Sequence, residues 1–348
     1  MTRSPYNSPR TRNSSDEVSP KPYELVPFPK NRPFLKPPSG HHQYLRDRQH
    51  GTLILKLEVQ TALHISTGVI ALGSDVGSRA PLIKTMVQDN EKKLMIQGSS
   101  LKGCIRSVYE AITNSTLAVI NTKLDRRIPK ERLPYGHKAS LCKREKLCPA
   151  SRVFGALDWQ GLVEFSDAQC ENASSDTGFM PSLYSPRPER QDYYSREFVT
   201  GRKFYYHTSS VIEPGENRGV PIQAAGRAYT FSTKIHFMNL FSAELGALLI
   251  ALGQDSKYPF ALKVGGGKPI GMGTMTVVVE AIEQVSDLRD RYTNYTSEPN
   301  QLSGQPLQQF MQRMVEAAHK QLIEQPQLEQ LAQILRYPTE REPPEGMY

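Results

Sequence analysis

Alternation of apolar and polar residues predicts several strands along the chain. Residues 51–65, GTLILKLEVQTALHI, place leucines and a valine at every second position from Leu53 to Val59. This is the pattern of a half-buried strand. A loop rich in Gly and Ser is expected to follow, as far as Arg79. Further strands are predicted in APLIKTMV, KKLMIQG, GLVEFSDAQ, RAYTFSTKIHFMNL and TMTVVVEAIEQV.

Helical periodicity marks three other segments. The first runs from about Ser100 to Ile112, with Leu101, Ile105 and Val108 on the same stripe as Ile112. FSAELGALLIALGQ predicts a second helix. The third has one apolar face, formed by Leu307, Phe310, Met311, Met314, Val315, Ala318 and Leu322. This face packs either on its own domain or on a neighbouring subunit. The order strand, helix, strands, strand, helix, strand predicts an α+β, ferredoxin-like core with large insertions.

Composition divides the chain into three parts. Residues 1–50 hold nine prolines, and nine Lys or Arg against four Asp or Glu. Such a basic arm buries too little apolar surface to order alone. It is therefore expected to be disordered when free, or to order on RNA or on another subunit. Residues 51–285 form the core domain, with insertions at about 120–155 and 175–220, and residues 286–348 form a linker and C-terminal amphipathic helices.

Charge and cysteine content narrow the functional classes. The formal net charge is +8, which favours an anionic partner such as nucleic acid. Four cysteines in 348 residues do not form the framework of a disulfide-rich secreted domain. The N-terminus lacks the apolar core of a signal peptide, and the longest apolar stretch, LGALLIALG, is too short to span a bilayer. A cytoplasmic protein without a membrane partner is expected.

The start of the first helix carries an unexpected pair of cations. Ser99 and Ser100 are good N-cap residues, and Lys102 and Arg106 follow at i, i+4 spacing. Two cations near the positive end of the helix dipole cost about 0.3–1 kcal/mol each unless an anion joins them. Backbone N–H groups, serine hydroxyls and both cations would bind such an anion. The alternative is a solvated basic face.

The stretch VGGGKPIGMG is rich in glycine but is neither a dinucleotide-binding fingerprint nor a P-loop, because Pro269 follows Lys268. Gly265, Gly266 and Gly267 instead predict a loop whose backbone comes very close to another group, with Lys268 beside it. A flexible hairpin turn is the alternative.

HKASLCKREKLCPAS offers metal-binding side chains. His137, Cys142 and Cys148 suit tetrahedral zinc, and Cys104 or Cys170 could supply a fourth ligand. Unliganded thiols in a basic loop are the alternative. The chain shows no nucleophile elbow, no HExxH and no carboxylate pair with clear acid–base logic.

Taken together, these stretches resemble the RAMP superfamily of CRISPR-associated proteins. GSSLKGCIRS looks like that family's G-S-S-L-K-G-x-x-R signature, and VGGGKPIGMG resembles its C-terminal glycine-rich loop. LCPASRVFG is similar to the C-P-x-C-R-L-F-G element of the type III branch, GRKFYYH to another element of that branch, and TALHISTG to the opening strand. The resemblance covers roughly residues 51–285.

The resemblance implies a Cas-seven-type backbone subunit of a type III CRISPR effector complex, with a III-D-like subtype as one option. Such subunits have an RRM-like palm and a thumb hairpin, and they bind guide RNA, target RNA and other CRISPR-associated subunits. Lys102, Arg106, Ser99, Ser100 and the glycine loop would then meet guide-RNA phosphates. Arg79, Arg202 and Lys203 are further expected RNA contacts.

Two departures from the family pattern bear on catalysis and on zinc. Cleaving members carry an aspartate where this chain has Arg79, in RAPLIK, and Asp75 is the nearby carboxylate. Ser151 stands where the family has the last cysteine of its element. A non-catalytic RNA-binding subunit is therefore the first hypothesis. An endoribonuclease using Asp75 with a divalent metal is the second, and a standalone ribonuclease using His64, which the family pattern places in a structural strand, is the third.

Overall fold

The protein is described by a computed structural model that covers residues 22–171, 176–181, 183, 191–211, 219–284, 293 and 300–343. Within these ranges no helix combines the length and apolar character needed to cross a bilayer. The chain is a mixed α/β protein. One large hydrophobic cluster joins residues from Val26 near the N-terminus to Leu335 near the C-terminus.

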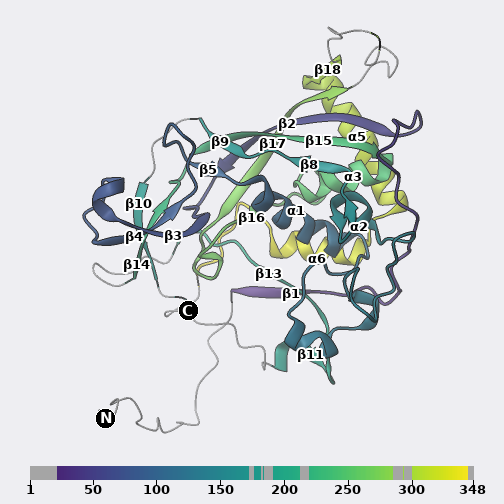
Figure 1. The fold of residues 1–348 in the computed structure, drawn as a ribbon, viewed down its shortest axis with the longest axis horizontal. Helices are drawn as coiled ribbons and strands as arrows, with labels where there is room; N and C mark the ends of the chain where they lie inside the picture. The colour runs from purple at the N-terminus through teal and green to yellow at the C-terminus, as the bar shows by residue number, and fades with distance from the viewer. Residues whose placement is uncertain are drawn as a thin grey trace.

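A large antiparallel sheet forms the centre of the fold (Figure 1). Its strands lie in the order β16-β17-β2-β15-β9-β5, with β8 also paired to β15 and β18 to β17. The predicted alternation of the long strand is confirmed, because Leu53, Leu55, Leu57 and Val59 are all buried. The strands are β2 Gln49–Val59, β5 Met95–Ile96, β8 Val163–Phe165, β9 Ala168–Cys170, β15 Thr230–Leu240, β16 Leu262–Lys263, β17 Thr274–Gln284 and β18 Asn300–Ser303.

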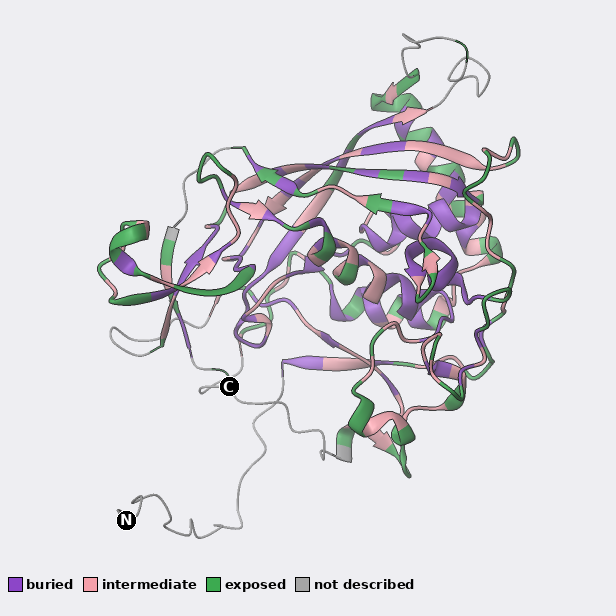
Figure 2. Ribbon diagram, viewed as in Figure 1, coloured by how far each residue is buried: buried purple, intermediate pink, exposed green. Residues whose placement is uncertain are grey.

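Helices cover one face of this sheet (Figure 1). They are α1 Gly98–Ile112, α2 Pro149–Phe154, α3 Ser242–Ala251, α5 Gly304–Gln321 and α6 Gln325–Ile334. Helix α3 is almost entirely buried, as Figure 2 shows. A Cβ on Gly246 of α3 would lie 1.9 Å from the carbonyl oxygen of Met314 on α5. The apolar face of α5 therefore packs on its own domain, with Leu307, Phe310, Met314 and Ala318 buried.

A smaller sheet projects from the body (Figure 1). Its strands lie in the order β10-β14-β4-β3, with bounds β3 Ser66–Leu72, β4 Leu82–Met86, β10 Asp176–Met180 and β14 Val220–Ala224. Ile222 and Met180 pack on one face with Ile270 and Met272 of the glycine-rich stretch. Strand β3 lies where the sequence predicted a loop, because it pairs with β4 from Ser66 to Leu72. Only the short 3-10 turn η1, Gly73–Val76, and the residues up to Arg79 remain outside strands there.

The predicted N-terminal arm packs on the domain from residue 22 onward. Strand β1, Tyr23–Pro27, pairs with β13, Gly201–Tyr205, and Lys36 bridges to Leu147. Residues 1–21 lie outside the described ranges. Residues 122–160 contain the 3-10 turns η2 Thr122–Arg127 and η3 Lys130–Arg132 and the hairpin of β6 Gly155–Ala156 with β7 Trp159–Gln160. Residues 191–199 contain the 3-10 turn η4 Gln191–Tyr193 and the hairpin of β11 Tyr194–Ser195 with β12 Phe198–Val199.

Candidate nucleic-acid interface

Helix α1 begins two residues earlier than the sequence predicted. Gln97 is its N-cap residue, so the prediction that Ser99 or Ser100 caps it is wrong. Both serines lie within the first turn, and the Gly98 N–H donates to Asp167 Oδ1 at 2.7 Å. A Cβ on Gly98 would lie 2.2 Å from the Phe165 carbonyl oxygen, which explains the glycine. The Asp167 carboxylate already stabilises the positive end of this helix.

Lys102 lies on the face of α1 beside the core stripe. It is half-buried, and its Nζ donates to the Val163 carbonyl oxygen at 3.4 Å. Burial, followed by the positive charge of Arg106, lowers the pKa of the Lys102 ammonium. No carboxylate in the described part of the chain forms an ion pair with Lys102. An added phosphate would relieve this destabilised charge, because an opposite charge favours the ionised form.

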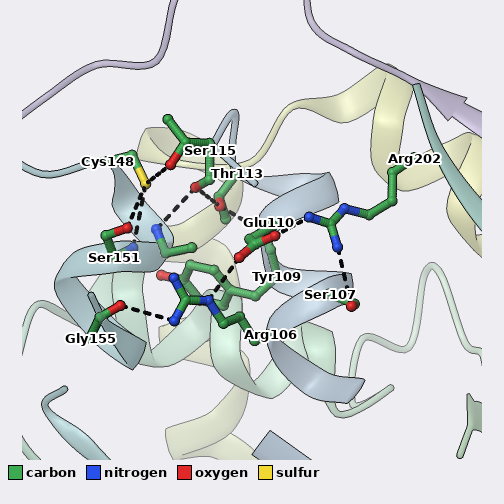
Figure 3. A network of polar contacts seen from close by, with 12 residues as sticks. Arg106, Ser107, Tyr109, Glu110, Thr113, Ser115, Cys148, Ser151, Gly155 and Arg202 are labelled. Atoms are coloured by element: carbon green, nitrogen blue, oxygen red, sulfur yellow. Dashed lines mark hydrogen bonds and ion pairs between the residues drawn. The ribbon is translucent and has the colours of Figure 1, made fainter. Parts of the chain in front are cut away.

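Arg106 is engaged inside the protein (Figure 3). Its Nε donates to Glu110 Oε1 at 2.7 Å, and a terminal nitrogen donates to the Gly155 carbonyl oxygen at 2.9 Å. Arg202 on β13 pairs with the other oxygen of Glu110 and donates to Ser107 Oγ at 3.2 Å. The Glu110 side chain is only 1% exposed. The two arginines thus neutralise one buried carboxylate and tie α1 to β13, which leaves them less available for RNA than the sequence predicted.

The glycine loop folds tightly against the chain segment that precedes β3. The Gly266 N–H donates to the His64 carbonyl oxygen at 2.9 Å, and a Cβ on Gly265 would lie 2.4 Å from the same oxygen. Gly265 and Gly267 adopt left-handed φ values of 78° and 68°. The close approach predicted from the glycines is therefore made to the protein's own backbone. Lys268 follows, half-buried, at the start of the 3-10 turn η5, Lys268–Ile270.

A buried lysine connects the glycine loop to α1. Lys263 Nζ donates to the Gly271 carbonyl oxygen at 2.9 Å and to Thr274 Oγ1 at 3.2 Å. Cys104 of α1 donates its thiol to the Lys263 carbonyl oxygen at 3.5 Å. Burial, and then the charge of Lys268, lowers the pKa of Lys263 to about 7. Lys268 therefore lies near Lys263 and Cys104, whereas Lys102 extends from the same helix toward Val163 on β8.

The pKa of Lys263 predicts a change of stability with pH. The group titrates near 7 in the folded chain and near its ordinary 10.5 when unfolded. Between these values the unfolded chain holds a proton that the folded chain has released, so the free energy of unfolding rises with pH. In urea titrations, wild type should gain about 2 kcal/mol relative to Lys263→Met from pH 7 to pH 9. Parallel pH curves for the two proteins would contradict this assignment.

The projecting sheet carries Arg79, which stands where an aspartate was expected for cleavage, and Asp75, the nearby carboxylate. Asp75 lies in η1, exposed, and accepts a hydrogen bond from Ser74 Oγ at 3.4 Å. Arg79 is exposed and forms no ion pair with any described residue. The strands around them expose large apolar side chains to solvent: Val69, Ile70, Leu72, Leu82 and Phe179. The structure therefore leaves Asp75, Arg79 and this apolar face open to a partner.

Lys203 is surrounded by tyrosines. Its Nζ lies 4.8 Å from the ring centroids of Tyr23 and Tyr205 and 5.8 Å from that of Tyr193. It also donates to the Tyr205 hydroxyl at 3.1 Å. Burial lowers the pKa of this ammonium, and cation–π contacts of this kind offset part of the cost. Lys203 thus stabilises the β1–β13 ribbon.

The three predicted zinc ligands do not lie together. The side chains of Cys142 and Cys148 are buried and in contact, and that contact, followed by burial, raises the pKa of the Cys142 thiol. Thr116 Oγ1 lies 3.2 Å from Cys148 Sγ. His137 instead places its Nε2 3.3 Å from Asp125 Oδ2. In the described part of the chain no three His, Cys, Asp or Glu side chains form a metal-binding group.

Comparison with known proteins assigns the family. The sequence model of the RAMP superfamily matches residues 56–276, from β2 to β17, including α1 and the glycine loop. The chain belongs to this superfamily and is therefore a CRISPR-associated, RNA-binding protein. No curated protein matches it significantly.

Sequence reasoning missed three residues that shape the site. Glu110 was detectable in principle, because it stands four residues after Arg106 on the same helix, which is an i, i+4 ion-pair spacing. Asp167 and Lys263 gave no local signal. Their roles depend on contacts with residues 69 and 11 positions away in the chain, which only the folded arrangement reveals.

Proposed function

We propose that this chain is a guide-RNA-binding, Cas-seven-type backbone subunit of a type III CRISPR effector complex, and that it holds guide and target RNA without cutting. The observation that carries the proposal is that Lys102 on the first half of α1, and Lys268 beside the Cys104 side of the same helix, form no ion pair with a described carboxylate. The Glu164 carboxylate acts electrostatically on Lys102 but forms no ion pair with it. Phosphate groups of a single strand supply the missing negative charge.

The topology supports this assignment. The central strands lie in the order β17-β2-β15-β9, with α1 between β2 and β8 and α3 between β15 and β17. Counted along the chain, β2, β9, β15 and β17 are the first to fourth strands, so their order across the sheet is fourth, first, third, second. A ferredoxin-like, RRM-type core would have this order and two crossover helices. The projecting sheet has the place expected of a thumb. Its exposed apolar side chains suit contact with a neighbouring subunit.

The direct test is the RNA that the chain retains. Purification from cells carrying its CRISPR locus, followed by sequencing of bound RNA, should recover guide RNAs enriched over total cellular RNA. Recovery of RNA with no such enrichment, by a folded protein together with its partner subunits, contradicts a guide-binding role.

Asp75 carries the alternative of target cleavage. RNA hydrolysis needs a group or metal ion to activate the attacking hydroxyl. The Arg79 guanidinium cannot act as a base at neutral pH and would repel a divalent ion. We expect the assembled complex to give the same target-cleavage map with Asp75→Ala as with wild type. Loss of one regularly spaced cut, with target binding kept, would make Asp75 catalytic and this chain an endoribonuclease.

The standalone-ribonuclease alternative has less support. His64 would have to serve as its base, but the ring is 2% exposed and its Nδ1 lies 2.7 Å from the Gln223 carbonyl oxygen. Burial lowers the pKa of this imidazole. The position suits core packing between the glycine loop and the projecting sheet.

Zinc stays a proposal for Cys142 and Cys148. Two adjacent thiols supply half of a tetrahedral ligand set, and the His137 ring lies apart from them in this structure. If zinc binds with His137 as third ligand, protein purified without chelators should carry close to one zinc per chain. Cys148→Ser should lose it, and a structural zinc contributes about 10–16 kcal/mol to local folding. Elemental analysis that finds no zinc in folded protein contradicts the site.

A further inference from the structure

A pocket of about 380 Å³ lies between the N-terminal arm and both insertions. Its lining comes from three segments far apart in sequence, residues 28–32, 129–132 and 195–200. Phe28, Phe198 and Val199 supply apolar surface, and Phe198 is 47% exposed. This size falls within the range of about 300–1,000 Å³ that is typical of small-ligand sites.

The pocket wall contains a buried cation that forms no ion pair with a described carboxylate. Burial lowers the pKa of its guanidinium, and the charges of Glu131 and Glu324 offset only part of this effect. Arg132 is 2% exposed, and its guanidinium donates only to neutral oxygens. These are Asn114 Oδ1 at 2.6 Å and the carbonyl oxygens of Pro29, Asn31 and Ser115 at 2.7, 2.9 and 3.4 Å. Among the described residues no carboxylate lies within ion-pair distance of it. A buried charge is costly unless it is paired, so this wall favours an anion.

The rim adds further positive charge. Lys30 and Arg32 line the pocket with Arg132, against the single carboxylate of Glu131. Glu131 Oε1 already lies 3.5 Å from Arg32 Nε. Just outside the lining, the Arg127 guanidinium lies 4.8 Å from the Tyr194 ring centroid. An occupant of this pocket therefore needs a negative group beside an apolar, stackable one.

We infer that this pocket binds an unpaired nucleotide of RNA, with the base against Phe28 and Phe198 and the phosphate toward Lys30, Arg32 and Arg132. Aromatic rings stack on any base, and cations neutralise the backbone. An acidic peptide would satisfy the cations but would leave the phenylalanine surface without a partner. A nucleotide satisfies both.

The pocket and the proposed guide-RNA site lie toward opposite ends of α1. Arg132 binds Asn114 and Ser115, just past the C-terminal end of the helix, whereas Lys102 lies in its second turn. Ten residues of α-helix, from 102 to the helix end at 112, rise about 15 Å. A strand of several nucleotides spans such a distance. The inference rests on the proposed function and adds a second contact point, formed by the arm and insertions.

Photocross-linking tests the pocket on the full chain. The probe is a short single-stranded oligouridylate containing 4-thiouridine, and mass spectrometry locates the linked peptide. Cross-links should fall within residues 28–32 or 195–200. Phe198→Ala should reduce them and weaken the probe's affinity about fivefold or more, the effect of losing one stacked base. Phe34→Ala is the matched control, because Phe34 is an exposed phenylalanine of the N-terminal arm that does not line the pocket.

Each other outcome overturns the inference, and the outcomes are distinguishable. If wild type binds the probe but cross-links lie elsewhere and Phe198→Ala binds normally, the pocket assignment fails and the guide-RNA proposal stands. If wild type binds no RNA, both fail. If a polyglutamate peptide binds wild type and loses affinity with Phe198→Ala while the probe cross-links elsewhere, the pocket belongs to a protein partner. Lys30→Gln, a rim substitution that leaves Arg132 intact, should make probe binding less salt-dependent.

Discussion

Glu110→Gln is expected to destabilise the fold by about 3 kcal/mol, because it leaves two partly buried arginines without their carboxylate. Arg106 and Arg202 both pair with Glu110, and their side chains are 17% and 18% exposed. The amide that replaces the carboxylate has nearly the same shape, so the loss reports charge and not packing. Urea unfolding followed by circular dichroism measures it.

A matched control separates this effect from the general loss of a surface ion pair. Glu91 pairs with Lys93 at 2.8 Å, with both side chains more than half exposed. Glu91→Gln should therefore change the free energy of unfolding by less than about 1 kcal/mol. Equal effects of the two substitutions contradict the role given to Glu110. Replacing Arg106, Glu110 and Arg202 together by Met should recover part of the stability, since removing a buried ionic group entirely costs less than breaking it.

Periodicity identified the elements whose signal is local. The stripe of Leu101, Ile105, Val108 and Ile112 on α1 and the alternation of β2 are confirmed, because spacing alone decides which face is buried. Strand β3 was missed because its residues from Thr67 to Leu72 are almost all exposed. A strand that buries neither face shows no alternation, and β3 depends on pairing with β4.

The candidate site was predictable only in part. Lys102 and Lys268 stay candidates because neither forms an ion pair with a described carboxylate. Arg106 changes its role because Glu110 and Gly155 take its donors, and the Gly155 contact joins positions 49 apart. The local sequence around a cation at the start of a helix is the same whether that cation binds a ligand or an internal carboxylate. Only tertiary contacts distinguish these cases.

The second large effect is expected from reversing the two available lysines. Lys102→Glu with Lys268→Glu should weaken single-stranded RNA binding about tenfold or more, because charge-assisted contacts contribute about 1.5–3 kcal/mol each. Arg106 is left unchanged in this variant, since its loss would disturb the Glu110 network and confound binding with folding. Far-ultraviolet circular dichroism and the midpoint of urea unfolding should show that the double variant stays folded.

A control with the same change of charge is available on α5. Arg313 and Lys320 are exposed on α5 and form no ion pair with any described residue. Arg313→Glu with Lys320→Glu lowers the net charge by the same four units. It should leave RNA affinity within about twofold, because long-range attraction between exposed charges is screened at physiological salt.

The salt dependence of RNA binding tests the central claim most directly. Dissociation constants for a single-stranded RNA are measured at salt concentrations from about 50 to about 200 mM. The proteins compared are wild type, the Lys102/Lys268 variant and the α5 control. Each phosphate contact contributes about 0.7 to the log–log slope, so the Lys102/Lys268 variant should be shallower than wild type by about 1.4 and the control unchanged. A folded Lys102/Lys268 variant with the wild-type slope would show that neither lysine contacts the RNA backbone, and would contradict the interface at α1 and the glycine loop.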